Sequence, residues 1–528
     1  MIRNPILPGF NPDPSICRVG EDYFIATSTF EWFPGVQIHH SRDLANWRLV
    51  ARPLCRAAQL DMRGNPDSCG IWAPCLSWAD GLFWLVYTDV KRFDGAFKDA
   101  HNYVVACDRI DGDWSDPIYV NSSGFDPSLF HDADGRKWFL NMRWNHRGAG
   151  TGCNPANDFF DGILLQEWSP ETGLTGPVTN IFAGTGRGLT EAPHLFRRDG
   201  WYYLFTAEGG TGYSHAITMA RARDIRRPYE IHPDRHLMTT ADAPHSPIQR
   251  TGHGQYVEGH DGRHWVTFLM GRPQWRDGRP YCPMGRETGL AEVEWRDGWL
   301  WLKGGGQVPP ETAPAAADPP ARQATEHRFG QGALPPEFQW LRTPRPERIF
   351  RLSGDGLILA GRESPGSWFE QSLVARRQED AGYTAETTLD WLPETYQQGA
   401  GLTTYYNRHK FHAAVVTHDD QVGRVLTLMS CPGLWPDAQI LFPCPPLALP
   451  DGPVELRVTV RDGWQQFFWR QGGDWQPFGP RLDALVISDE GGRGEHGSFT
   501  GAFVGMMAFD LTGQGREARF TRFRYAPE

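Results

Sequence analysis

Three acidic residues occur in short motifs that resemble one another. Asp13 lies in NPDPS, Asp126 in GFDPS and Glu191 in TEAPH, so each stands one or two residues before a proline. A single residue of this kind is ordinarily a turn or capping residue, but burying three together is costly unless a function or partner requires it. Two carboxylates that flank a sugar ring can hydrolyse a glycosidic bond, because one activates water and the other protonates the leaving oxygen. Glycoside hydrolysis is therefore one chemistry open to this set.

The three motifs belong to a longer repeat in the first three hundred residues. Each copy contains a hydrophobic stretch, a turn with glycine and an aromatic strand, and five copies start roughly 60 residues apart. That spacing accommodates a four-stranded unit, and a ring of such units predicts a five-bladed β-propeller. A further strand pair at 291–305 is expected to complete the last blade or close the ring. The repeat positions that should converge near the propeller axis hold Asp13, Trp72, Asp126, Glu191 and His253.

The chain divides into two predicted domains, and its fold class is all-β. Residues 1–304 form the expected propeller, which carries the catalytic candidates. Residues 305–328 are rich in proline, alanine and glycine without apolar periodicity, which is typical of a linker. Residues 329–528 consist of short alternating strands with no clear helical period. This pattern predicts a C-terminal β-sandwich, jelly-roll-like in form.

Composition excludes several classes of partner. The 528 residues include 52 basic and 63 acidic side chains, a formal net charge of 52 − 63 = −11, which argues against nucleic-acid or anionic-membrane binding. No segment has the apolar length of a membrane span, and the amino terminus lacks the apolar stretch of a secretory signal. The nine cysteines include no CxxC pair, so we expect reduced core residues rather than disulfides or structural zinc. Together these features predict a soluble, cytoplasmic protein.

Several long motifs resemble one known family. NPILPGFNPDPSI, GNPDSCGIWAPCLSWADG, TEAPHLF and CPMGRET occur in the order found in the inverting β-xylosidases of glycoside hydrolase family 43. The resemblance continues into the second domain through AGLTTYYN and FTGAFVG. It implies that Asp13 is the general base and Glu191 the general acid. It also implies that Asp126 orients that acid and holds its pKa up by like-charge proximity.

The same resemblance implies sugar-binding roles for five further residues. Phe30 and Trp72 would form apolar walls, and Phe499 would be the aromatic tip of a sandwich loop that narrows the cleft. Arg286 would contact substrate hydroxyls, although an ion pair between blades is an alternative. His253 would lie on the axis opposite the base, where it touches the sugar or orders water. A structural histidine or a ligand to an axial cation are the other interpretations of His253.

The implied activity is that of an inverting exo-1,4-β-xylosidase, which releases xylose from the non-reducing ends of short xylo-oligosaccharides. Side activity as an α-L-arabinofuranosidase is expected, because the two terminal pentoses present similar hydroxyl patterns. Two alternatives remain, namely a main arabinofuranosidase activity and a non-catalytic carbohydrate-binding propeller. No cofactor or catalytic metal is expected, with a structural divalent cation on the propeller axis left open. By analogy with the family, the chain is expected to form a homo-oligomer, a dimer or tetramer.

Overall fold

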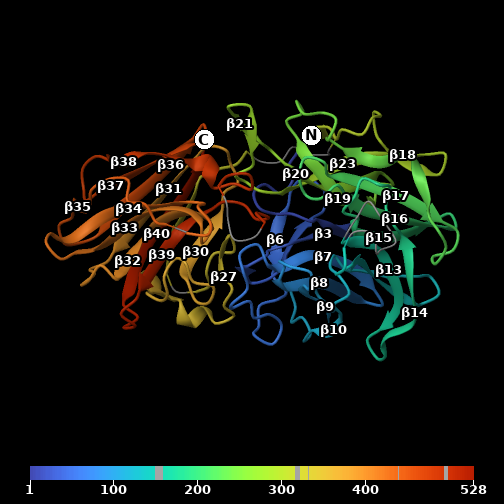
Figure 1. Cartoon of the computed structure of the whole chain (residues 1–528), viewed down its shortest axis with the longest axis horizontal. Helices are drawn as coiled ribbons and strands as arrows, with labels where there is room; N and C mark the ends of the chain where they lie inside the picture. The colour runs from blue at the N-terminus through green and yellow to red at the C-terminus, as the bar shows by residue number, and fades with distance from the viewer. Residues whose placement is uncertain (149–158, 315–320, 331, 438, 493–496) are drawn as a thin grey trace.

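The computed structural model describes residues 1–148, 159–314, 321–330, 332–437, 439–492 and 497–528. Two bodies built from β-sheet lie side by side, the amino-terminal one blue to green and the carboxy-terminal one orange to red (Figure 1). The helices in these described ranges are two single 3₁₀ turns, η1 (Pro346–Arg348) and η2 (Ala484–Val486). The all-β class predicted from the sequence is thereby confirmed.

The amino-terminal body is a five-bladed propeller, as predicted. Within the described residues its five blades are four-stranded antiparallel sheets that follow one another around a ring (Figure 1). Blade one consists of β2 (Ser15–Val19), β3 (Asp22–Thr27), β5 (Gln37–Ser41) and β6 (Arg48–Ala51). Blade two consists of β7 (Gly70–Ala79), β8 (Leu82–Arg92), β9 (Asp99–Cys107) and β10 (Ile118–Asn121). Blade three consists of β11 (Ser128–His131), β12 (Lys137–Trp144), β13 (Phe160–Ser169) and β14 (Gly173–Phe182). Blades four and five are β15 (Glu191–Arg198), β16 (Trp201–Glu208), β17 (Ala216–Ala222) and β18 (Glu230–Thr239), then β19 (Gln249–Glu258), β20 (His264–Gly271), β23 (Glu287–Arg296) and β24 (Trp299–Leu302).

The sequence repeat corresponds to the inner pair of strands in each blade. The first strands β2, β7, β11, β15 and β19 contact one another in succession, and β19 closes the ring against β2. Each first strand pairs with the second across a short turn. The strand pair predicted at 291–305 corresponds to β23 and β24, which complete blade five. Equivalent repeat positions therefore face a common axis.

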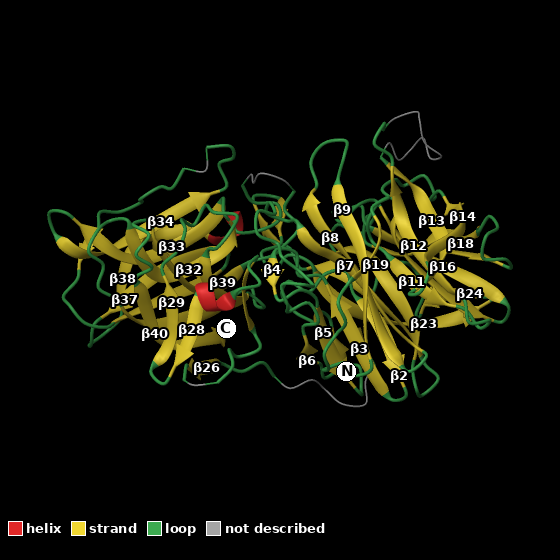
Figure 2. Ribbon diagram, turned by 90° about the horizontal axis from the view of Figure 1, so that it is seen from below, coloured by secondary structure: helices red, strands yellow, loops and turns green. Residues whose placement is uncertain are grey.

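The carboxy-terminal body is a sandwich of two β-sheets (Figure 2). One sheet contains β28 (Phe350–Ser353), β29 (Gly356–Ala360), β40 (Glu517–Pro527), β31 (Tyr383–Asp390), β36 (Val454–Arg461), β37 (Trp464–Arg470) and β38 (Gln476–Asp483), with β26 (Thr325–Arg328) paired to β40. The other contains β35 (Leu447–Ala448), β34 (Gly423–Pro432), β33 (Lys410–Asp419), β32 (Gln398–Asn407), β39 (Phe503–Asp510), β30 (Ser372–Arg377), β27 (Phe338–Leu341) and β4 (Trp32–Phe33). Alternating Val, Leu and Ala side chains from both sheets form the core between them.

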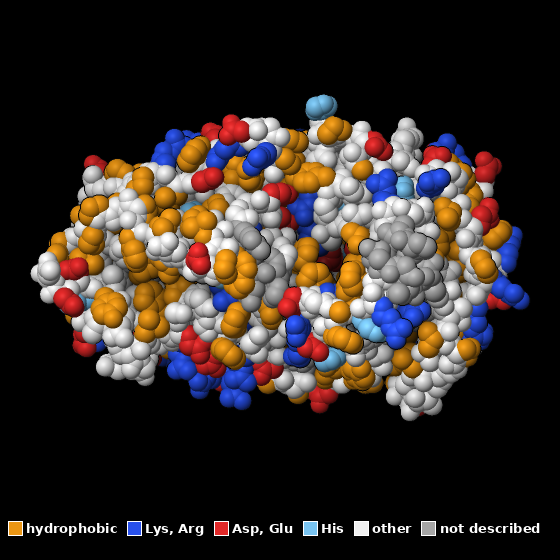
Figure 3. Space-filling model, in the orientation of Figure 1, with side chains coloured by type: hydrophobic (Ala, Val, Ile, Leu, Met, Phe, Trp, Pro, Cys, Tyr) orange, Lys and Arg blue, Asp and Glu red, His pale blue; other side chains and the backbone are white. Residues whose placement is uncertain are grey.

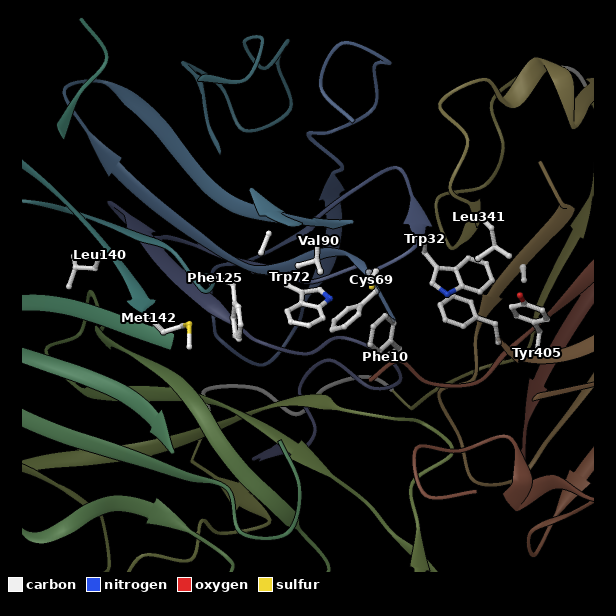
Figure 4. Close-up of a cluster of buried hydrophobic side chains, with 14 of the residues drawn as sticks. Phe10, Trp32, Cys69, Trp72, Val90, Phe125, Leu140, Met142, Leu341 and Tyr405 are labelled. Atoms are coloured by element: carbon white, nitrogen blue, oxygen red, sulfur yellow. The ribbon is translucent and has the colours of Figure 1, made fainter. Parts of the chain in front are cut away.

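The two bodies are joined more intimately than a linker at 305–328 would suggest. Strand β4 belongs to the first blade's sequence but pairs with β27 of the sandwich, and the Trp32 ring stacks on Phe503 with centroids 3.7 Å apart. Within 305–328, β25 (Thr312–Ala313) pairs with β1 (Ile2–Arg3) on the propeller, and residues 315–320 lie outside the described residues. Figure 4 shows the resulting row of apolar side chains, which runs from Phe125 and Trp72 in the propeller to Leu341 and Tyr405 in the sandwich. The hairpin β21 (Gln274–Arg276) and β22 (Arg279–Tyr281) adds another contact.

Candidate active site

All of the predicted site residues line a single pocket at one end of the propeller axis. Its volume is about 280 Å³. The predicted residues in its lining are Asp13, Phe30, Trp72, Asp126, Glu191, His253, Arg286 and Phe499. Figure 3 shows this face of the molecule hollowed near its centre, with acidic side chains visible at depth. The repeat thus brings together residues that are up to 240 positions apart in the first domain, from Asp13 to His253.

Local backbone shape turns the side chains toward the axis. Asp13, Asp126 and His253 have φ values of 55°, 54° and 39°, in the left-handed region that residues with a Cβ rarely adopt. Where Trp72, Glu191 and His253 lie, the register between the first and second strands shifts, as it does at a β-bulge. A backbone of this kind costs about 1–3 kcal/mol per residue and is found where function requires a fixed side chain. Strand geometry alone would not aim these groups at one point.

Asp13 is surrounded by hydrogen-bond donors. Ser28 Oγ donates to its Oδ2 at 2.7 Å, and Arg286 Nη1 donates to its Oδ1 at 3.1 Å. His253 Nδ1 lies 3.6 Å from the same Oδ1. Burial and the charge of Arg286 lower the pKa of His253 to about 3, so the imidazole is neutral near neutral pH. Arg286 is therefore the cation that faces Asp13.

The position of His253 differs from the expectation. The sequence placed it opposite the base, whereas the structure places it beside Asp13. The reason is ring closure, because β19 of blade five packs against β2 of blade one. The first and last repeat positions are neighbours on the ring, so the residues farthest apart in the repeat are adjacent in space.

Asp126 and Glu191 form a pair of buried carboxyl groups. Burial raises the pKa of Asp126 to about 8, and the charge of Asp13 adds to the rise. Burial likewise raises the pKa of Glu191 well above its ordinary value, with further contributions from the charges of Asp126 and Asp13. The backbone N–H of Ala192, the residue after Glu191, donates to Asp126. Carboxyl groups that oppose each other's ionisation retain a proton between them near neutral pH.

Aromatic side chains from both bodies form the pocket walls. The Phe30 and Trp72 rings lie 5.7 Å apart between centroids, and Phe499 of the sandwich lies 6.0 Å from Trp72. Phe499 also accepts a hydrogen bond on its backbone oxygen from Arg286 Nη2 at 2.6 Å. One guanidinium thus connects Asp13 with the sandwich loop. The sandwich is part of the pocket rather than a separate appendage.

Several pocket residues were missed at the level of sequence. They are Phe93, Phe125, Phe160, Leu189, Gly210 and Thr211. Phe125 precedes Asp126 inside GFDPS, and Thr211 lies in TAEGGTGY, so both stand in motifs that could have indicated them. Phe93 directly follows β8 in blade two, Phe160 is the first residue of β13 in blade three, and neither carries a repeat signal. Ser28, whose hydroxyl binds Asp13, lies in the equally recognisable ATSTF segment.

Glu208 is a further buried acidic residue of the propeller. Its Oε1 accepts hydrogen bonds from Thr185 N and Thr190 Oγ1, at 2.8 and 3.0 Å. Its Oε2 accepts from Thr185 Oγ1 and Thr218 Oγ1, at 2.7 and 2.6 Å. Glu208 does not line the pocket, and its oxygens are occupied by three threonines. It holds the loop that contains Thr185 and Thr190 against strand β17, which contains Thr218.

Metal binding, membrane crossing and disulfide bonding can each be judged in the described part of the chain. No group of three or more His, Cys, Asp or Glu side chains there is arranged to hold a metal ion. Nor does any helix within the described ranges combine the length and apolar character needed to cross a membrane. Eight cysteines are free thiols, most of them buried, and Cys153 lies outside the described residues.

The geometry defines the class of protein. A carboxylate held by a cation can take a proton from water, while a protonated carboxyl group nearby can deliver one to a departing oxygen. Aromatic walls around such a pair are suited to the apolar faces of a sugar ring. These are the parts of a glycoside hydrolase.

Comparison with known proteins gives the family. Residues 2–300 match the model of glycosyl hydrolases family 43, and residues 326–526 match that of the beta xylosidase C-terminal concanavalin A-like domain. The chain belongs to glycosyl hydrolases family 43. It is 55% identical to the xylosidase/arabinosidase 43B of Humicola insolens (100% of this chain, 98% of the relative) and 47% identical to a beta-xylosidase of Bacillus subtilis strain 168 (99% of each). The crystal structure of a xylan beta-1,4-xylosidase from Bacillus halodurans C-125 superposes with a TM-score of 0.94 at 46% identity, over the whole of both chains.

Proposed function

We propose that this protein is an inverting exo-1,4-β-xylosidase that removes xylose from the non-reducing ends of short xylo-oligosaccharides. The observation that carries the proposal is the arrangement of Asp13, Asp126 and Glu191 in one enclosed, aromatic-walled pocket. Full-length similarity to proteins named beta-xylosidase supports the choice of substrate. The name of the Humicola insolens relative also supports activity on arabinosides.

Each carboxyl group has a separate role in the proposed reaction. Asp13 accepts a proton from water, which attacks the anomeric carbon from the face opposite the leaving group and inverts its configuration. Glu191 delivers its proton to the glycosidic oxygen, so the bond to the leaving sugar breaks as that sugar departs as an alcohol. Asp126 sustains the raised pKa of Glu191 and, through the backbone N–H of Ala192, fixes the turn that carries it. Arg286 and Ser28 keep Asp13 in position for water.

The shape of the pocket favours removal of terminal residues. Phe499 from the sandwich and Phe30 and Trp72 from the propeller close around a volume of about 280 Å³. An enclosed pocket of this size admits the end of a chain, whereas internal cleavage of a polymer needs an open groove. Short oligosaccharides with a free non-reducing end are therefore the proposed substrates.

Hydrolysis of nitrophenyl β-xyloside and nitrophenyl α-L-arabinofuranoside, measured side by side, tests the proposal. We expect turnover of both, with the larger kcat/KM for the xyloside. A larger value for the arabinofuranoside would make arabinofuranosidase the main activity. Binding of xylobiose without turnover of either compound would instead identify a carbohydrate-binding propeller.

Two further proposals accompany this function. The free thiols favour a reducing compartment, so the proposed location is the cytoplasm. The reaction described above uses only protons and water, so we propose that it needs no cofactor. Dialysis against a chelator followed by assay of xyloside hydrolysis tests this, and loss of activity that is restored by a divalent cation would contradict it.

A further inference from the structure

A cluster of four charged residues is buried where the sandwich meets the propeller. Glu31 and Asp67 come from the propeller, and Arg342 and Arg408 come from the sandwich. Arg342 Nη2 lies 2.7 Å from Asp67 Oδ1, and Arg408 Nε lies 3.2 Å from Asp67 Oδ2. Three of the four residues are only 1% exposed, and Arg408 is 7% exposed. The catalytic scheme uses none of them.

Arg342 also holds the backbone of the propeller. Its amide donates to Glu31 O at 2.9 Å, and its Nε donates to Asn65 O at 2.8 Å. Its own carbonyl accepts from Met62 N. The sandwich residue thus binds two propeller segments at once, one ending at Glu31 and the other running from Met62 to Asp67.

Each of those segments leads directly to a pocket wall. Glu31 is adjacent to Phe30, which has a left-handed φ of 52°. Asp67 is adjacent to Ser68, whose carbonyl accepts from Trp72 Nε1 at 3.0 Å and whose Oγ accepts from Phe499 N at 3.2 Å. Phe30 is therefore the residue next to the cluster, while Trp72 and Phe499 each reach it through one hydrogen bond to Ser68, the residue after Asp67.

We infer that Asp67, Arg342 and Arg408 are positioning residues, which set the sugar-binding walls Phe30, Trp72 and Phe499 through Glu31 and Ser68. The inference rests on the proposed function, since it concerns the pocket for the terminal sugar. Buried ion pairs of this kind are poor sources of net stability, because desolvation offsets much of their attraction, but removal of one partner leaves an uncompensated charge. Here these ion pairs fix the positions of the pocket walls. They make the pocket dependent on contact with the sandwich.

The test compares Asp67→Asn with a matched control, Glu386→Gln. Glu386 is also buried and is held by Arg457 and Arg522, but all three residues belong to the sandwich, and the ion pairs described for them stay within that body. Both changes neutralise a buried carboxylate between arginines without changing side-chain size. Steady-state kinetics on xylobiose are measured well below the unfolding temperature of the least stable variant. Asp67→Asn is expected to raise KM about tenfold while changing kcat less than threefold, whereas Glu386→Gln leaves KM unchanged.

A double variant distinguishes positioning of the aromatic walls from a general loosening of the fold. If Asp67 acts through the aromatic walls, adding Asp67→Asn to Phe499→Ala raises KM much less than it does in the wild-type background. Equal increases in the two backgrounds, or an increase in Glu386→Gln equal to that in Asp67→Asn, would contradict the inference. If Asp67→Asn does not fold, Arg408→Lys replaces it, with an expected threefold rise in KM that is absent in the Phe499→Ala background.

The same measurements separate this inference from the function on which it rests. A wild-type protein that hydrolyses neither xylobiose nor aryl glycosides contradicts the proposed function. A wild-type protein that hydrolyses xylobiose, with unchanged KM in Asp67→Asn, contradicts only the positioning role.

Discussion

The two ends of the propeller channel are built by the same repeat, but Asp13, Asp126 and Glu191 all lie in the pocket at one end. At the other end, β7, β11, β15 and β19 line a hollow of about 600 Å³ with Ser128, His131, His194 and Gln255. Burial lowers the pKa of His131 to about 4 and that of His194 to about 3, so both imidazoles are neutral and weakly basic near neutral pH. Asp132 is there as well, but Arg197 and the Tyr202 hydroxyl occupy its oxygens.

The difference between the ends lies in what covers them. The sandwich places Phe499 over one end, and burial is the largest cause of the raised pKa of both Asp126 and Glu191. The other end has no sandwich residue in its lining. The propeller therefore brings the carboxyl groups together, and the sandwich contributes to the enclosure of the end that holds them.

The largest effect is expected from removal of the base. Asp13→Ala should abolish hydrolysis of xylobiose and of aryl xylosides alike, because every substrate needs an activated water whatever its leaving group. We expect a loss of at least about 10³-fold in kcat, comparable with removal of other essential catalytic groups. Progress curves with both substrates on the folded variant check this. Turnover close to that of the wild type would exclude Asp13 as the base.

Asp126→Asn should have a smaller effect that depends on pH. Glu191 must be protonated to act as acid, so activity falls as pH rises through its pKa. The charge of Asp126 is one cause of that raised pKa, and its removal lowers the pKa of Glu191. The basic limb of the kcat profile should therefore move to lower pH, with kcat near neutrality reduced about 10–100-fold, within the range of general acid catalysis. A basic limb that stays in place would mean that Asp126 does not act on Glu191.

Phe499→Ala tests whether the sandwich forms a wall of the occupied pocket. An aromatic wall desolvated against a sugar contributes about 1–3 kcal/mol, so KM for xylobiose should rise about tenfold while the propeller remains folded. Circular dichroism confirms folding, and initial rates give KM. Kinetics identical to those of the wild type would show that the sandwich does not line the occupied pocket.

The smallest effect is expected at the other end of the channel. His131→Asn removes an imidazole that hydrogen-bonds Ser77 in that hollow, at the end of β11 that is farther from Asp126. We expect kcat/KM for xylobiose within about twofold of wild type, as is usual for changes outside a functional site. A loss comparable to that of Phe499→Ala would show that the two ends are coupled.

Much of this arrangement could be predicted from the sequence because the repeat identifies equivalent positions in successive blades. Asp13, Trp72, Asp126, Glu191 and His253 share one repeat position, and a propeller brings such positions together. The repeat does not itself show that blade five packs against blade one, and it is this closure of the ring that places His253 beside Asp13.

Other features could not be predicted from the repeat. The pairing of β4 with β27 joins residues about three hundred positions apart and leaves no local signal in a two-residue strand. The contact of Arg342 with Asp67 is equally non-local, and its two residue types are ordinary at exposed positions. Phe93 and Phe160 reach the pocket from outer strands or loops, where side-chain direction depends on tertiary packing.

The most direct test of the proposed mechanism is how the loss of activity in Glu191→Ala depends on the leaving group of the substrate. In the proposed reaction Glu191 is the proton donor, and a donor matters only when the departing oxygen is a poor leaving group. Glu191→Ala should therefore lose about 10²–10⁴-fold in kcat/KM on xylobiose, the range of general acid catalysis, but much less on an aryl xyloside with an acidic phenol. Equal losses on the two substrates, with binding intact, would contradict the assignment of Glu191 as the acid.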